Sequence, residues 1–342
     1  MNVLLLILGF VLLIKCADIF VDGSVLISEY FRIPSFIIGI TIVAMGTSAP
    51  EAAISITASI HSSDGIAVGN VIGSNIFNLL IVLGISALIR PLPVSTRILK
   101  VEYPLALLAA VMIPFLSNNL FSSDELILTR IDGILLLAVF IFFMAITVQS
   151  GKKQIIHDRS KEAHGNTTVP SDSTGINNGS SVRDKKTHSL RIRRNPLLRG
   201  ILLVIAGLAG IISGGTLVVN SASEIALHLG ISQTLVGLTI CAIGTSLPEL
   251  VTSAVATYKG ETDIAVGNVI GSNIFNILFV LSISAIVRPI PVDPLSITDS
   301  FILSGISLAA FVPLLQKKEL HRIPGVVFII IYAAYTVYII MR

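Results

Sequence analysis

Two glutamates in apolar surroundings are the residues of this sequence best suited to binding a cation. Glu51 ends the sequence GTSAPE and Glu249 ends the sequence GTSLPE, each near the middle of a long apolar stretch. In a membrane, a carboxylate at such a depth normally faces a cavity or a partner of opposite charge. Away from the ends of the long apolar stretches, Lys15 is the only basic residue, and it cannot neutralise two carboxylates in opposite halves of the chain. We therefore expect both glutamates to coordinate cations; a structural ion pair or a shared proton is the alternative.

Further oxygen ligands accompany each glutamate at helical spacing. Thr47 lies four residues before Glu51, so the two share one face of a helix, with Ala44 about one turn below. Pro50 has no N–H group and crowds the carbonyl of Gly46, so the helix should break there and leave backbone carbonyls free. Carboxylate, hydroxyl and carbonyl oxygens suit Ca²⁺ or Na⁺ rather than a soft transition metal.

A second motif, GNVIGSNIFN, adds neutral oxygens at 69–78 and again at 267–276. In each copy a serine and an asparagine stand four residues apart on one helical face. The candidate cation ligands are therefore Glu51, Glu249, Thr47, Thr245, Ser48, Ser246, Ser74, Ser272, Asn78, Asn276 and the carbonyls of Ala44 and Ala242. The other asparagines of the motif, Asn70, Asn75, Asn268 and Asn273, are expected to hold the broken helices together rather than to bind the ion.

Membrane-spanning helices must position these residues. Of the 342 residues, 53% are hydrophobic and 13% are charged, whereas soluble domains carry about 25% charged residues. Lipid requires backbone polar groups to be bonded within the chain, and apolar stretches of about 20 residues without alternation favour helices over a barrel. We thus predict an all-α membrane protein with ten spans, at about 3–29, 35–60, 65–89, 99–117, 128–149, 197–227, 232–257, 263–287, 297–315 and 323–341.

The chain also contains an internal duplication. IAVGNVIGSNIFN at 66–78 recurs unchanged at 264–276, an offset of 198 that also relates GTSAPE to GTSLPE. We divide the chain into a first five-helix repeat at 1–150, a flexible basic cytoplasmic loop at 151–196 and a second five-helix repeat at 197–342. Five is an odd number, so the second repeat should have inverted topology, as in transporters that bind substrate at the bilayer midplane. A structural duplication without a transport role is the alternative.

Basic residues predict the orientation. Of 23 Lys and Arg residues, 11 lie between Lys152 and Arg199, and cytoplasmic loops carry an excess of such residues. We expect a multi-pass protein of the cell membrane with this loop in the cytoplasm and both termini outside.

Other polar residues support weaker expectations. Lys15, Asp18 and Asp22 lie three and four residues apart, which favours an internal Lys15–Asp18 pair, with a cytosol-facing gate or ion path as the alternative. At the offset of 198 their counterparts are uncharged: Ser213, Thr216 and Asn220. Cys16 and Cys241 are expected to be packing thiols, because no CxxC spacing accompanies them. The sequence contains no Ser–His–Asp or Cys–His constellation in a credible setting, which argues against an enzyme.

The paired motifs, GTSAPE with GNVIGSNIFN and GTSLPE with GNVIGSNIFN, resemble the alpha repeats of the sodium/calcium exchanger family, within the cation/calcium exchanger superfamily. The size and short central loop resemble its compact prokaryotic members. This resemblance implies a core of the second, third, seventh and eighth helices, across which the first and sixth slide. It also implies that Glu51, Glu249, Thr47, Thr245, Ser74, Ser272 and the carbonyls of Ala44 and Ala242 are ion ligands, with Asn78 and Asn276 at the remaining positions.

The implied activity is exchange of Na⁺ for Ca²⁺ by alternating access, with both ions as substrates and the lipid bilayer as surroundings. No cofactor, nucleic acid or obligate protein partner is expected. Potassium-dependent relatives carry an acid where this chain has Asn276, as do some sodium/calcium members, so the neutral residue disfavours potassium co-transport without excluding it. A Ca²⁺/H⁺ antiporter is the nearest alternative; a cation channel and a membrane scaffold are others.

Overall fold

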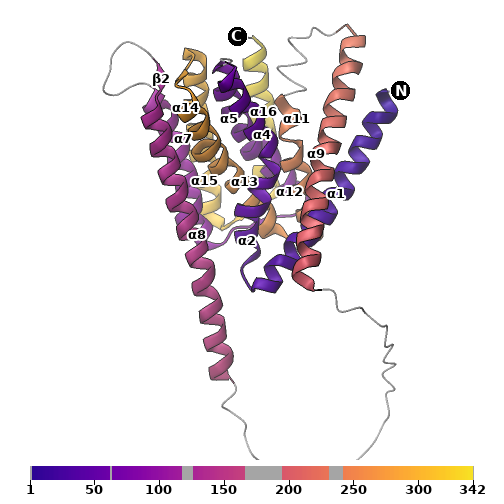
Figure 1. Ribbon diagram of the computed structural model, residues 1–342, viewed down its shortest axis with the longest axis vertical. Coiled ribbons are helices and arrows are strands. Elements are labelled where there is room, and N and C mark those ends of the chain that lie inside the picture. The colour runs from indigo at the N-terminus through magenta and orange to yellow at the C-terminus, as the bar shows by residue number, and fades with distance from the viewer. Residues whose placement is uncertain (1, 62–63, 118–125, 166–194, 231–241, 342) are drawn as a thin grey trace, which may run out of the picture.

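The computed structural model describes residues 2–61, 64–117, 126–165, 195–230 and 242–341. Within these ranges the chain is almost entirely helical, and its long helices lie side by side in one bundle (Figure 1). Both termini lie at one end of the bundle. The last turns of α8 (Arg130–Gly165) and the first of α9 (Pro196–His228) lie at the other end.

Eight described helices are long and apolar enough to cross a membrane. In the first half these are α1 (Asn2–Phe31), the run of α5 (Asp64–Phe77), η2 (Asn78–Val82) and α6 (Leu83–Ile89), the run of η3 (Ile98–Glu102) and α7 (Tyr103–Ser117), and α8. In the second half they are α9, the run of α13 (Thr262–Phe275), η5 (Asn276–Leu281) and α14 (Ser282–Val287), α15 (Pro294–Lys317) and α16 (Arg322–Met341). A further span is broken: α2 (Ser35–Ile38), η1 (Gly39–Val43) and α3 (Ala44–Thr47) meet α4 (Ala49–Ile60) at a bend of 48°.

The prediction of an all-α, multi-pass membrane protein is confirmed, and nine of the ten predicted spans coincide with these helices. Of the seventh, residues 232–241 lie outside the described ranges, and the remainder forms α11 (Ala242–Thr245) and α12 (Leu247–Lys259). The total of ten therefore stays a prediction. Residues 151–165, which we assigned to the loop, continue α8 because no proline interrupts this stretch. Residues 166–194 lie outside the described ranges.

Burial divides the spans into an inner and an outer set. In the most apolar window, 83% of residues are buried for the span Thr262–Val287 and 72% for Gly65–Ile89, against 17% for α16 and 22% for α1. Large apolar side chains such as Ile131 and Ile323 are exposed on the outer helices, as expected for a surface that faces lipid tails. The spans that carry GNVIGSNIFN are therefore the centre of the bundle.

Two short antiparallel ladders link the halves of the chain. β1 (Leu92–Pro93) pairs with β4 (Glu319–Leu320), with Leu92 opposite Leu320. β2 (Ile127–Leu128) pairs with β3 (Ile290–Pro291), with Leu128 opposite Ile290. Each ladder therefore joins one segment from the first half to one from the second.

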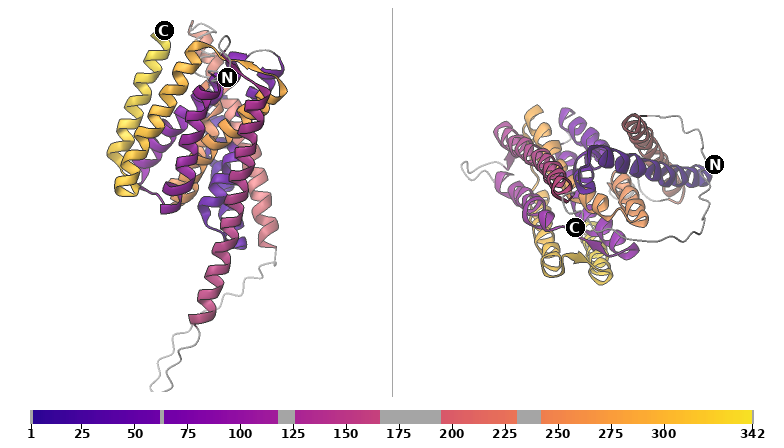
Figure 2. Two further views of the ribbon diagram at one scale, coloured as in Figure 1. Left: turned by 90° about the vertical axis from the view of Figure 1, so that its left-hand side faces the viewer. Right: turned by 90° about the horizontal axis from the view of Figure 1, so that it is seen from below.

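The helices α1 and α9 form a close pair beside the inner set (Figures 1 and 2). Glycines permit this approach: a Cβ atom added at Gly207 would lie 2.7 Å from the backbone nitrogen of Phe20, and one at Gly23 would lie 2.8 Å from that of Val204. Small residues let helix backbones approach in this way where lipid provides no hydrophobic driving force. The pair is therefore a unit with its own backbone-to-backbone interface.

We expect Gly207→Ala to destabilise the protein, because the new methyl group collides with the α1 backbone, at a cost of about 1–3 kcal/mol. The matched control is Gly305→Ala on α15, where an added Cβ meets nothing within 4 Å. Thermal unfolding in detergent measures both. A melting temperature equally unaffected by the two substitutions would contradict the close-packed interface.

Candidate cation-binding site

The predicted helix breaks lie directly before the two glutamates. Ser48, with φ −84° and ψ 10°, separates α3 from α4, and Ser246, with φ −91° and ψ 7°, separates α11 from α12. In each case a proline occupies the start of the following helix, where its missing N–H group costs no hydrogen bond. Each glutamate therefore stands in the first turn of a helix that begins inside the bundle.

The two glutamates meet around one site and are held crosswise. Both side chains are completely buried. Ser48 donates a hydrogen bond to Glu249 Oε1 at 2.7 Å, and Ser246 donates one to Glu51 Oε1 at 3.1 Å. Each serine therefore fixes the carboxylate of the opposite half.

Neither glutamate forms an ion pair with any residue in the described part of the chain. The predicted alternative of a structural salt bridge thus finds no support there. The second oxygen of each carboxylate, Oε2, is buried and accepts no hydrogen bond from the described residues. Burying a carboxylate without a compensating charge is costly, so the pair needs either a bound cation or a proton.

Neutral oxygens of the predicted ligand set lie in the same region. Thr47 and Ser272 both contact the carbonyl of Ala44, at 3.4 and 3.5 Å, and both hydroxyls lie beside Glu249. Thr245 lies beside Glu51, and Ala242 is the first residue of α11. These contacts bring together residues of three of the four motif copies: GTSAPE, GTSLPE and the second GNVIGSNIFN.

The remaining predicted ligands end in buried oxygens that form no hydrogen bond with the described residues. These atoms are Ser74 Oγ, Asn78 Oδ1 and Asn276 Oδ1. Asn78 and Asn276 each begin a π-helical segment, η2 or η5, a distortion that is frequent at functional sites. With the two carboxylate oxygens, five buried oxygens of the ligand set are available to a hard cation, whose ligands are of this kind.

Asn70 and Asn268 brace the helices of the site, as expected. Asn70 donates to Ser55 Oγ at 2.9 Å and to the carbonyl of Glu51 at 3.3 Å. Asn268 makes the equivalent bonds in the second half, to Ser253 Oγ at 2.9 Å and to the carbonyl of Glu249 at 3.4 Å. The backbone of each glutamate is therefore tied to the neighbouring inner helix.

Ser55 and Ser253 are not among the site residues predicted from the sequence. Each lies four residues after its glutamate, hence on the same helical face, and each recurs at the offset of 198. That repeated spacing was the available signal.

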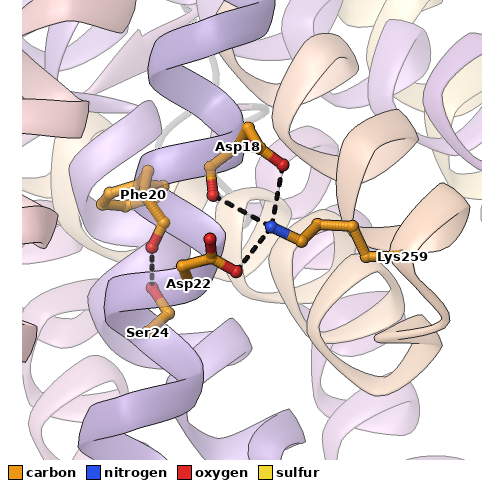
Figure 3. Close-up of polar contacts among 5 residues, drawn as sticks. All are labelled: Asp18, Phe20, Asp22, Ser24 and Lys259. Atoms are coloured by element: carbon orange, nitrogen blue, oxygen red, sulfur yellow. Dashed lines mark hydrogen bonds and ion pairs between the residues drawn. The ribbon is translucent and has the colours of Figure 1, made fainter. Parts of the chain in front are cut away.

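The expected Lys15–Asp18 pair is wrong. Asp18 and Asp22 instead both pair with Lys259, the last residue of α12, which reaches Asp18 Oδ1 at 2.8 Å (Figure 3). The aspartates lie four residues apart and so share the face of α1 that packs on α12, whereas Lys15 is exposed. Cys16 packs against Gly210 of α9, and Cys241 lies outside the described residues.

Comparison with known proteins agrees with this geometry. The profile of the family described as "Sodium/calcium exchanger protein" matches residues 1–149 and 199–341. The chain is 39% identical over 316 residues to the putative antiporter CaxA of Alkalimonas amylolytica, covering 92% of this chain and 90% of that protein. It is 35% identical over 358 residues to the sodium/calcium exchanger MaX1 of Methanosarcina acetivorans, covering 98% and 97%.

Among solved structures, the sodium-calcium exchanger NCX_Mj soaked with zero Na⁺ and Ca²⁺ superposes with a TM-score of 0.78 at 31% identity, covering 99% of this chain and 98% of that one. These relatives are transporters rather than enzymes, and the match extends through both halves. The resemblance seen in the motifs is thereby confirmed, and the chain belongs to the sodium/calcium exchanger family.

Proposed function

We propose that this protein exchanges Na⁺ for Ca²⁺ at a single site built around Glu51 and Glu249. The observation that carries the proposal is the crossed pair of buried carboxylates, each with an oxygen that no described protein group satisfies. The names of the relatives MaX1 and NCX_Mj support the choice of ions.

The mechanism follows from charge balance. Two ionised carboxylates give the site a charge near −2, which one Ca²⁺ or several Na⁺ can neutralise. Hydroxyl, amide and carbonyl oxygens complete the coordination of either ion. Because the ions use the same oxygens, their binding is competitive. An empty site carries bare charge, which low-dielectric surroundings oppose, so only an ion-filled site passes between the two access states.

Alternating access requires a part of the protein that moves relative to this site. The close pair of α1 and α9 suits that role, because glycine contacts hold the two helices to each other. The proposal includes ten helices in two inverted repeats, at 1–150 and 197–342, with the intervening segment in the cytoplasm and both termini outside. The bonds that recur at an offset of 198, such as Asn70–Ser55 and Asn268–Ser253, support this pseudo-symmetry.

Replacing either glutamate with glutamine should weaken Ca²⁺ binding by at least roughly tenfold, or about 1.4 kcal/mol, and abolish Na⁺-driven Ca²⁺ flux. The amide keeps the shape of the side chain and removes the charge that holds the ion. Radiolabelled Ca²⁺ uptake into proteoliposomes measures the flux. Glu224→Gln, the same change at an exposed position of α9, is the control. Full flux in Glu51→Gln or Glu249→Gln would contradict the assignment.

A Ca²⁺/H⁺ antiporter is the rival, because buried carboxylates can also carry protons. Wild-type proteoliposomes with imposed Na⁺, K⁺ or H⁺ gradients distinguish the two. We expect Ca²⁺ uptake to follow an outward Na⁺ gradient at equal pH and to ignore K⁺. Uptake driven by a pH gradient in the absence of Na⁺ would establish the rival.

A further inference from the structure

Four buried asparagines, two from each half, form a hydrogen-bonded relay at the centre of the bundle. Asn75 donates through Nδ2 to the backbone carbonyl of Asn273 at 3.3 Å, and Asn273 donates to that of Asn75 at 3.4 Å. Asn276 donates to Asn75 Oδ1 at 3.2 Å, and Asn78 donates to Asn273 Oδ1 at 3.3 Å. All four side chains are at most 4% exposed.

The relay has a fixed polarity. An asparagine amide has one donor end and one acceptor end of almost the same shape, so packing alone does not decide which way it points. A backbone carbonyl can only accept, so Asn75 must turn its Nδ2 toward Asn273. Its Oδ1 then faces Asn276, which must donate in turn. The Oδ1 of Asn276 is left buried, with no hydrogen-bond partner in the described part of the chain.

The same order holds in the other direction, from the carbonyl of Asn75 through Asn273 to Asn78. The Oδ1 of Asn78 likewise has no hydrogen-bond partner among the residues that the structure describes. We propose that Asn75 and Asn273 are positioning residues that make Asn276 and Asn78 present a carbonyl oxygen, and not an N–H group, to the transported cation. This inference rests on the proposed function, because it takes the cation site to include Asn78 and Asn276.

The relay also accounts for a neutral residue at position 276. An ionised aspartate there has no donor, so its oxygen would face the acceptor Oδ1 of Asn75. Relieving that contact would require Asn75 to turn over, and the carbonyl of Asn273 would lose its donor. The relay therefore requires a hydrogen-bond donor at this position, which the amide of Asn276 supplies.

A double-mutant cycle on Asn75 and Asn276 tests the proposal through equilibrium ⁴⁵Ca²⁺ binding to purified protein in Na⁺-free buffer. We expect Asn75→Ala and Asn276→Ala each to weaken binding by roughly tenfold. The double variant should bind no more weakly than Asn276→Ala, because Asn75 acts through Asn276. The matched control combines Asn75→Ala with Asn78→Ala. The losses should multiply there, since alanine at position 75 keeps the backbone carbonyl that orients Asn273.

If the double variant of Asn75 and Asn276 loses Ca²⁺ affinity by the product of the two single-variant losses, the relay is overturned. If Asn75→Ala does not fold, the pseudo-symmetric cycle on Asn273 and Asn78 gives the same discrimination. Wild-type protein that binds no Ca²⁺ would contradict the proposed function itself, whereas normal Ca²⁺ binding with a multiplicative cycle would contradict the relay alone.

A second, independent observation concerns the ion pairs between α1 and α12. Lys259 contacts Asp18 Oδ1, the carbonyl of Asp18 and Asp22 Oδ1, so one ammonium group joins α12 to two levels of α1 (Figure 3). Gly23 packs against Gly200 near the start of α9. The bonds of Lys259 to Asp18 and Asp22, which we call the clasp, therefore lie in the half of the bundle where α9 begins.

The position related to the clasp by the offset of 198 lacks the corresponding charged residues. The offset of 198 carries Asp18 and Asp22 onto Thr216 and Asn220 of α9, and Lys259 onto His61 at the end of α4. α1 packs along α12, whereas α9 and α4, both completely described, barely touch. The two ends of the moving pair are thus unequal both in charge and in packing.

We infer that the clasp holds the α1–α9 pair against the inner helices at the end where α9 begins, and so favours the conformation closed at that end. This second inference also rests on alternating access. Movement of the pair must separate Lys259 from both aspartates, and the uncharged Thr216 and Asn220 provide no equivalent bond on the opposite side.

Hydrogen–deuterium exchange of purified protein tests the clasp in Lys259→Gln, with Lys15→Gln as a control that removes the same charge from the exposed face of α1. We expect Lys259→Gln to raise exchange in residues 24–31 and to lower it in residues 49–60 and 216–228, because one end opens as the other closes. Lys259→Arg should restore the wild-type pattern. A rise confined to residues 24–31 would indicate a merely structural bond and overturn the inference, as would no change at all.

Discussion

The burial of two carboxylates in one place is the constraint on which the rest of this structure depends. Like charges in a medium of low dielectric repel each other strongly, and two glutamates from separate helices would not approach unless something compensates them. The serines that cross from one half to the other supply a neutral part of that compensation. Under the proposed function, the transported cation supplies the remainder.

The inner helices serve this arrangement. Helix breaks at Ser48 and Ser246 start a new helix just before each glutamate, and asparagines from the adjacent inner helix tie down its backbone. The amides of Asn75 and Asn273 are oriented by the backbone carbonyls to which they donate. The outer pair of α1 and α9 is built differently, with glycine contacts inside the pair and a single charged attachment to α12 among the described residues. This contrast between the inner helices and the outer pair is what the proposed alternating access would need.

Sequence alone anticipated much of this, and the reason is duplication. An identical thirteen-residue segment at two positions exposes both halves of the site, and proline directly before glutamate in an apolar stretch predicts a broken helix with a functional charge. The sequence could not predict which residues of the two halves contact each other. The bond from Ser48 to Glu249 joins residues 201 positions apart, and that from Lys259 to Asp18 joins residues 241 positions apart. Local spacing instead favoured Lys15 as the partner of Asp18. The continuation of α8 to Gly165 was missed because a polar composition does not prevent a helix.

The most direct test of the central claim is whether Na⁺ and Ca²⁺ compete for the same oxygens. Equilibrium ⁴⁵Ca²⁺ binding to the purified protein should be measured at fixed pH and ionic strength while Na⁺ replaces choline. The account predicts that the apparent Kd for Ca²⁺ rises more steeply than in proportion to Na⁺ concentration, because several Na⁺ replace one Ca²⁺, and that K⁺ has no such effect. A Ca²⁺ affinity that ignores Na⁺ and changes only with pH would contradict it.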